Sequence, residues 1–156
     1  MKTATIQELK QELLAVNQPK LLELCLRLAK FKKENKELLT FLLFEAHDEE
    51  SYINSVKQLI DEGFTEVPKP NLYLTKKSLR KTLRITYRYI KYAGSKQAEA
   101  ALLIYFCQKM KDSGISYQKS TVLNNLYEQQ LKKINAALKQ MHEDLQYDYQ
   151  REVDLL

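Results

Sequence analysis

Apolar side chains recur at three- and four-residue intervals along most of the chain, with polar side chains between them. This spacing places apolar residues on one face of an α-helix, whereas a half-buried strand alternates at every second residue. No segment carries a strong strand signal. We therefore expect an all-α protein of about seven helices, with approximate ranges 5–16, 19–33, 35–47, 48–63, 75–92, 95–111 and 120–149.

Residues that favour helix ends separate these segments. Thr5 and Glu8 fit a capping box, Pro19 suits a first helical turn, and Asp48 precedes two acidic residues that suit the positive end of a helix. Asn35 is expected to cap the third helix. The three glycines of the chain are expected to end the fourth, fifth and sixth helices; they are Gly63, Gly94 and Gly114.

Two of the expected helices are apolar on almost every side and are predicted to lie at the centre. They are the third, around 38–44, and the sixth, around 98–107. The segments 24–44 and 83–106 share one arrangement, a helix, a tight turn and an apolar helix. This arrangement resembles the HEAT and armadillo class of α-solenoids, which implies helices stacked as antiparallel pairs. A compact irregular bundle fits the same pattern.

The length of 156 residues fits a single domain, 1–156. A break between subdomains is most compatible with segment 63–74, because Pro68 and Pro70 favour an extended chain there. The last residues, 147–156, are expected to fray or to act as an acidic tail.

Apolar residues of the last expected helix follow the 4-3-4-3-4 spacing of a coiled coil. They are Tyr127, Leu131, Ile134, Leu138, Met141 and Leu145. This stripe is either the core face of the last helix, which we favour, or the seam of a weak homodimer. A monomer and such a homodimer both remain open.

Several function classes lack the residues they need. The glycines stand too far apart for a phosphate-binding loop, and neither His47 nor His142 belongs to a zinc or di-iron motif. No nucleophile motif is present, so we expect no enzymatic activity, no cofactor and no bound metal. Cys25 and Cys107 lie in separate apolar stretches and are expected to be reduced. Without a bilayer-spanning or secretion signal, a cytoplasmic protein that does not enter membranes is expected.

The net charge of +5 is unevenly distributed. From Val67 to Ala98 there are nine Lys or Arg and no Asp or Glu, so the rest of the chain carries a net −4. On a helix, six of these cations share an arc roughly 100° wide; they are Lys77, Arg80, Lys81, Arg84, Arg88 and Lys91. Tyr89 and Tyr92 lie beyond this arc and are expected to complete a groove.

Three interpretations of this basic face compete. Arg and Tyr are common anchors in protein interfaces, which favours an acidic protein partner. A row of cations also neutralises phosphates without reading sequence, which favours nucleic acid. Alternatively, the acidic segments 45–66 (net −6) and 143–156 (net −4) cover the face. Among binding functions, we favour docking of an acidic protein and keep nonspecific nucleic-acid binding as the alternative.

Overall fold

The computed structural model describes residues 1–156 and contains eight α-helices and no strand. The all-α prediction is confirmed, with one helix more than expected. A π-helical turn, η1 (Phe41–Glu45), and a 3-10 turn, η2 (Tyr117–Lys119), complete the elements. The helices are α1 (Ile6–Ala15), α2 (Gln18–Phe31), α3 (Lys33–Thr40), α4 (Glu49–Thr65), α5 (Leu72–Ala93), α6 (Lys96–Asp112), α7 (Thr121–Leu138) and α8 (Glu143–Val153).

The chain divides into two compact units, residues 1–44 and 45–156. Helices α1 to α3 belong to the first unit, and α4 to α8 belong to the second. The segment 63–74 lies inside the second unit, where it contains the end of α4, a short loop and the start of α5. The Thr75 hydroxyl donates to the carbonyl oxygens of Pro68 and Asn71, each at 2.9 Å, and thereby fastens this loop to α5.

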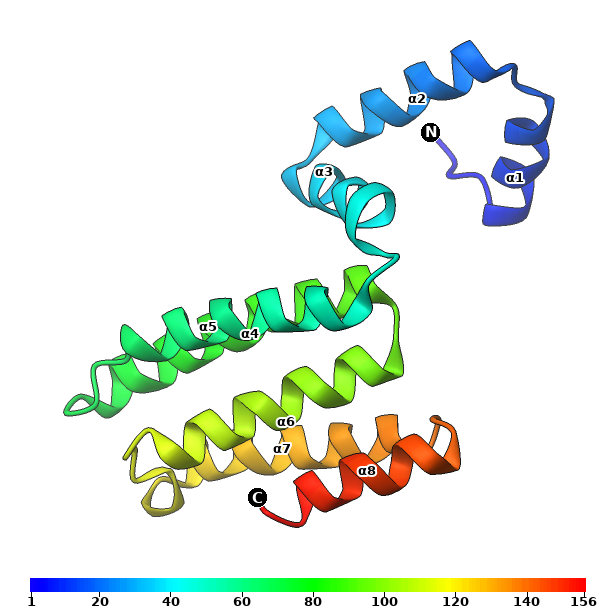
Figure 1. Ribbon diagram of the computed structural model, residues 1–156. Coiled ribbons are helices and arrows are strands. Elements are labelled where there is room, and N and C mark those ends of the chain that lie inside the picture. The colour runs from blue at the N-terminus through cyan, green and yellow to red at the C-terminus, as the bar shows by residue number, and fades with distance from the viewer. The chain divides into compact units, whose positions relative to one another are not determined.

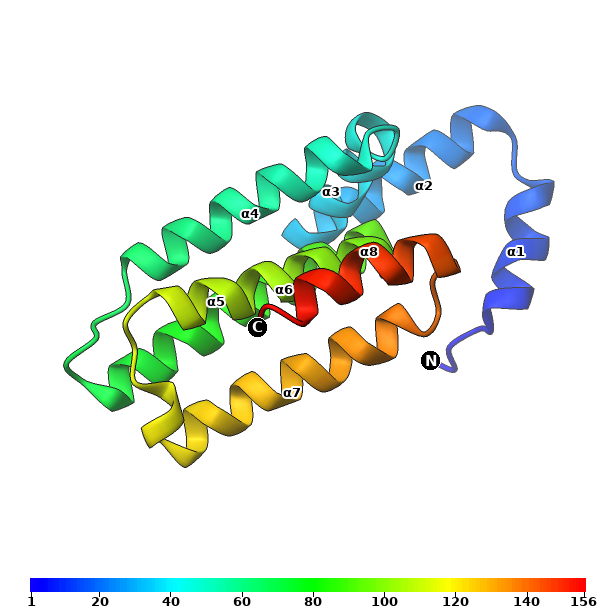
Figure 2. The same cartoon turned by 60° about the horizontal axis from the view of Figure 1, so that its bottom comes forward.

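The second unit is a helical bundle of neighbouring antiparallel helices (Figures 1 and 2). Helix α4 packs on α5, and α6 packs on α7. Helix α6 also contacts α4, α5 and α8, so it lies in the middle of the bundle. None of the eight helices combines the length and apolar character required to cross a bilayer.

Helix α6 is buried on almost every side, which confirms its predicted central place. Full burial of one large aliphatic side chain contributes about 1.5–3 kcal/mol, so this helix contributes strongly to the stability of the bundle. Its buried residues are Ala98, Ala100, Ala101, Leu102, Leu103, Ile104, Phe106, Cys107 and Met110.

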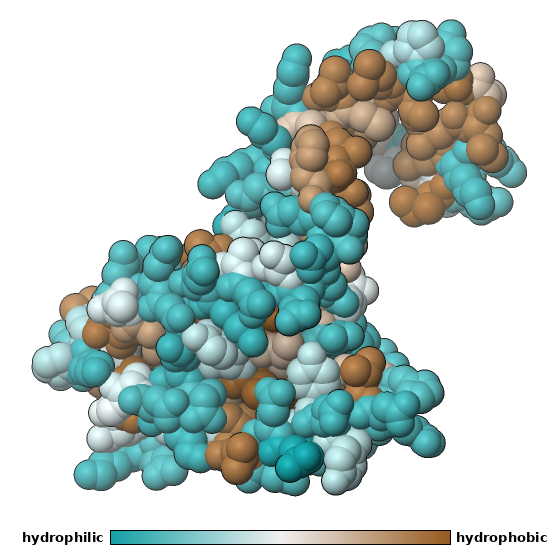
Figure 3. Space-filling model, in the orientation of Figure 1, coloured by the Kyte–Doolittle hydropathy of each residue, from teal (hydrophilic) through white to brown (hydrophobic).

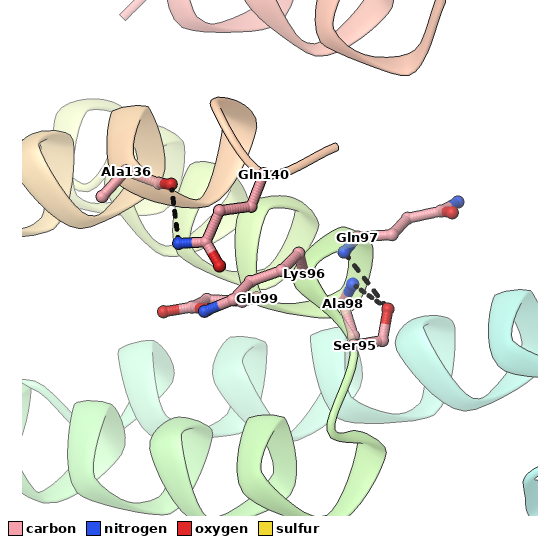
Figure 4. A network of polar contacts seen from close by, with 7 residues as sticks. All are labelled: Ser95, Lys96, Gln97, Ala98, Glu99, Ala136 and Gln140. Carbon is pink, nitrogen blue, oxygen red and sulfur yellow. Dashed lines mark hydrogen bonds and ion pairs between the residues drawn. The ribbon is translucent and has the colours of Figure 1, made fainter. Parts of the chain in front are cut away.

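The first turn of α6 is held by side chains from its own sequence (Figure 4). Ser95 is the N-cap, and its hydroxyl accepts from the backbone N–H groups of Gln97 (3.1 Å) and Ala98 (3.3 Å). Lys96 and Glu99 form an ion pair at 2.7 Å one turn apart. Lys96 is therefore already neutralised, although it belongs to the acid-free run of cations.

The last expected helix, 120–149, is broken in the structure. Helix α7 ends at Leu138, and α8 begins after His142, whose Nδ1 accepts from the Asp144 N–H at 3.4 Å. The acidic pair that follows His142 favours a new helix start at this point. The heptad spacing continues across this point, so the sequence pattern did not predict the break. The coiled-coil seam is therefore interrupted, and its first part, including Ile134, lies in the core of the bundle.

The prediction that the third helix lies at the centre is wrong. In residues 1–44 only Phe41 is buried, and the side chains of Leu42, Leu43 and Phe44 are exposed. The predicted N-cap of this helix is also wrong. Helix α3 begins after Lys32, so Asn35 lies inside the helix, and its side chain donates to the Leu28 carbonyl oxygen at 2.8 Å. An apolar sequence thus marks a surface here rather than a core.

Gly63 does not end its helix, because α4 continues to Thr65. Gly94 does end α5, in the left-handed conformation with φ of 62° that favours glycine. Gly63 serves packing instead, since it faces Thr82 of α5. Neighbouring Phe64 packs edge-on against Phe106 of α6, with ring centroids 5.2 Å apart.

Candidate functional site

Helix α5 is oriented by its buried side. Leu79, Leu83 and Thr86 lie in the core of the second unit, and the Tyr87 hydroxyl donates to Oε1 of Gln130 on α7. These contacts fix the rotation of α5 about its axis. The opposite side of the helix, which carries the predicted cations, therefore faces outward.

The predicted basic face is largely exposed. Five of its six cations are exposed and form no salt bridge, and they are Lys77, Arg80, Lys81, Arg84 and Lys91. Arg88 is half-buried, with its guanidinium carbon 5.8 Å from the centre of the Tyr89 ring. Four of these exposed, unneutralised cations, from Lys77 to Arg84, thus lie close together along α5.

These charges line an open concavity of about 570 Å³ between the start of α5 and the loop before it. Because Thr75 fastens the loop at Pro68, the wall opposite α5 is held in place. Five cations and one carboxylate line the concavity, so its local charge is strongly positive. The lining residues are Glu66, Pro68, Tyr73, Leu74, Lys76, Lys77, Ser78, Arg80, Lys81 and Arg84.

Two lining residues, Tyr73 and Leu74, were not among the residues predicted from the sequence. Their side chains are 70% and 41% exposed. The predicted helix began at Thr75, whereas α5 begins at Leu72 because the Asn71 side chain caps it, accepting from the Leu74 N–H at 3.1 Å. Recognition of Asn71 as an N-cap places Tyr73 on the same arc as the cations.

The two predicted tyrosines lie elsewhere. Tyr92 is buried, and its ring packs edge-on against Tyr89 at 5.7 Å between centroids. Tyr89 is half-buried beside Tyr52 of α4, whose hydroxyl donates to the Tyr89 carbonyl oxygen at 2.8 Å. These rings hold helices together, and they do not line the concavity.

The acidic segments do not pair with the exposed cations of α5. Asp61 of α4 pairs with Lys109 of α6 at 2.7 Å, and Glu66 lines the concavity without a salt bridge. Helix α8 packs on α6 and α7, and the end of the chain is held there by a hydrogen bond from Lys111 to the Leu155 carbonyl oxygen at 2.6 Å.

The remaining polar and sulfur groups do not form a second site of comparable exposure. Cys107 is buried, and burial raises the pKa of its thiol to about 12. Cys25 is a free, exposed thiol. No group of three or more His, Cys, Asp or Glu side chains is placed to hold a metal ion. The cationic concavity is therefore the best candidate for a binding site.

Comparison with known protein families, curated proteins and solved structures finds no match for this chain.

Proposed function

We propose that this chain is a non-enzymatic binding module whose cationic concavity on α5 docks an acidic segment of a partner protein. The observation that carries the proposal is a set of exposed cations around one hollow, with no salt bridge to any residue of the chain. Cations gathered in a hollow raise the local concentration of an oppositely charged partner and speed its association.

The apolar residues of the concavity support a protein partner rather than a nucleic acid. Tyr73 is largely exposed beside Leu74 and Pro68, and tyrosine and arginine are frequent anchors of protein interfaces. Single-stranded nucleic acids need several exposed rings for stacking bases. The predicted stacking residues Tyr89 and Tyr92 are half-buried and buried, so they support that alternative poorly.

The size of the concavity also suits a peptide. Its volume of about 570 Å³ falls within the range of roughly 300–1,000 Å³ typical of binding clefts. We infer that the bound segment presents one apolar side chain to Tyr73 and Leu74 and carboxylates to Lys77, Arg80 and Lys81. A helix with alternating pairs of acidic and apolar residues satisfies this requirement.

A binding assay with defined probes tests the proposal. The probes are a fluorescein-labelled peptide of Glu-Glu-Leu-Ala repeats, a poly-glutamate peptide, a DNA duplex and a single-stranded RNA. We expect the leucine-containing peptide to bind most tightly. We expect Lys77→Glu/Lys81→Glu to weaken its binding by roughly tenfold or more, and Tyr73→Ala to weaken it but not the binding of poly-glutamate.

The matched control is Lys132→Glu/Lys139→Glu, which makes the same charge change at two exposed lysines of α7 and its C-cap. Equal loss of binding in both double variants contradicts the proposal, because attraction would then depend on net charge alone. Tighter, salt-dependent binding of the DNA or RNA probe, lost in Lys77→Glu/Lys81→Glu only, would assign the same surface to nucleic acid.

A further inference from the structure

The first unit, residues 1–44, exposes apolar side chains along all three of its helices. Phe41 is its single buried residue. Figure 3 shows hydrophobic residues gathered over α1 and α2. The exposed large apolar residues are Ile6, Leu9, Leu13, Leu14, Leu21, Leu22, Leu26, Leu28, Phe31, Leu38, Leu42, Leu43 and Phe44. The unit thus has almost no core of its own.

On α1 and α2 these side chains form continuous faces. Ile6, Leu9 and Leu13 follow one another at steps of three and four on α1, and Leu21, Leu28 and Phe31 lie on one face of α2. This spacing is the one by which helices pack on other helices in bundles and coiled coils. Each face therefore has the pattern of a surface that packs against another helix.

A unit of this size needs a source of stability beyond its own packing. Units near 40 residues usually depend on disulfides, a bound metal or association with another chain. Both cysteines are free, and no cluster of side chains is placed to hold a metal. Association is the source that remains.

The apolar faces of α1 and α2 are large enough for a small stable interface. Their six residues are 38–81% exposed and are Ile6, Leu9, Leu13, Leu21, Leu28 and Phe31. At on the order of 100 Å² each, they present roughly 600 Å² in total, and specific protein interfaces begin at about 600 Å² per partner. An apolar surface of this extent lies at the upper end of the roughly 300–600 Å² found on a typical monomer.

The charges beside the apolar faces favour a second copy of the chain as the occupant. On α1, Glu8 and Glu12 outnumber Lys10, whereas α2 carries Lys20, Arg27 and Lys30 against Glu23 alone. The net charges of the two helices are thus opposite in sign, so opposite charges of two copies can pair. A helix that lies on anionic lipid carries mainly Lys and Arg on its polar side, which α1 does not.

We propose that the exposed faces of α1 and α2 pack against the same faces of a second copy of this chain. A two-fold axis would bring each face against its equivalent and place four helices around one shared apolar core. The proposal is independent of the binding function of α5, since it rests on residues 1–44 alone.

Sedimentation velocity of the full chain at about 1–100 µM tests this interface. We expect a dimer for the wild type and a roughly 100-fold weaker dimer for Leu9→Lys/Leu13→Lys. The matched control is Gln7→Lys/Gln11→Lys, which adds two lysines at the same spacing on the opposite side of α1 and should remain dimeric. Phe31→Lys, at a 76% exposed position of α2, tests the same interface independently.

Two outcomes overturn the proposal. The first is a monomeric wild type over this concentration range; its co-sedimentation with phosphatidylserine-containing vesicles would assign the face to a lipid surface instead. The second is a dimer that neither Leu9→Lys/Leu13→Lys nor Phe31→Lys weakens, because the contact would then lie outside α1 and α2. Circular dichroism at matched concentrations shows whether each variant retains the helices of α4 to α8.

Discussion

Gly63 marks a close approach of α4 to α5. A Cβ atom at this residue would lie 2.3 Å from Oγ1 and 2.7 Å from Cγ2 of Thr82, which is closer than such atoms approach in proteins. The Thr82 side chain is branched at Cβ and donates to the Ser78 carbonyl oxygen at 3.2 Å, so it has little freedom to turn away. The absence of a side chain at residue 63 sets the distance between these helices.

Gly63→Ala should therefore lower the free energy of unfolding by about 1 kcal/mol. Overpacking costs about 1–3 kcal/mol, whereas alanine gains at most about 1 kcal/mol in helix propensity. Urea denaturation followed by circular dichroism measures the change. Gly63→Ala/Thr82→Ala should recover part of the loss, and a Gly63→Ala protein more stable than wild type would refute this account.

The two cysteines differ in environment, and their reactivity should differ accordingly. Burial, with a smaller contribution from the charge of Glu128, raises the pKa of the Cys107 thiol to about 12. Because the thiolate is the reactive form, Cys107 should resist a thiol reagent at neutral or mildly alkaline pH. In Cys25→Ser protein, mass spectrometry should detect modification of Cys107 only after addition of denaturant. Rapid modification of the native variant would show that this part of α6 opens readily.

Among the elements, α4 and α6 are joined by a polar bridge at the surface. The Tyr105 hydroxyl donates to both carboxylate oxygens of Asp61 at 2.9 Å, and Lys109 donates to Oδ1 at 2.7 Å. Burial opposes ionisation of Asp61, but the hydrogen bonds from Lys109 and Tyr105 hold its pKa below the ordinary value. A carboxyl with a lowered pKa stabilises the fold above its unfolded pKa, and this contribution is lost as the pH falls through the folded pKa.

Asp61→Asn should consequently lower the melting temperature at pH 7 and reduce its decline towards acid pH. Melting temperatures measured from about pH 7 to pH 2 test this expectation. Asp148→Asn on α8 provides the control, because Asp148 is exposed and forms no hydrogen bond or ion pair. Parallel curves for wild type and Asp61→Asn would mean that the bridge contributes nothing to stability.

At the level of elements, helix boundaries were predicted well from the sequence where a capping residue or a turn residue lies at the end of the helix. The capping box of Thr5 and Glu8, the helix start at Asp48 and the helix end at Gly94 all occur as predicted. The break between α7 and α8 escaped prediction, because Met141 and Leu145 continue the apolar spacing across it. The break depends on the cap at His142 and on the acidic residues that follow it, which favour a helix start. The spacing of apolar residues carries no information about these local interactions.

The candidate site shows the same division between local and tertiary information. The exposed arc of Lys77, Arg80, Lys81 and Arg84 follows from helical spacing alone. The concavity depends on the loop at Pro68 folding back onto Thr75, which is a tertiary contact that no local pattern encodes. The burial of Tyr92 likewise depends on how side chains pack around α5 rather than on its place in the helix.

For the whole molecule, stability is concentrated in the second unit. The buried residues of α6 are surrounded by α4, α5 and α7, whereas residues 1–44 bury Phe41 alone. The spacing of apolar residues is similar in both units, because periodicity shows that a helix has an apolar face but not what covers it. For this reason both the third and the sixth helix were predicted to lie at the centre, although only the sixth does.

Hydrogen exchange should reveal this unequal distribution. Amides of α6 should exchange only through global unfolding, and amides of α1 to α3 should exchange much faster through local opening. Mass spectrometry of peptides after timed deuterium labelling measures both, at micromolar and submicromolar protein concentration. Equal protection in the two units, at both concentrations, would contradict the proposed dependence of residues 1–44 on association.

The nearly coreless first unit also has a consequence during synthesis. Residues 1–44 leave the ribosome before residues 45–156, and translation at roughly 5–20 residues per second separates the two events by several seconds. Throughout that interval the leucine faces of α1 and α2 have no folded neighbour. We expect general chaperones that recognise apolar segments to bind the nascent chain during this interval. These residues must therefore remain soluble before their apolar faces are covered.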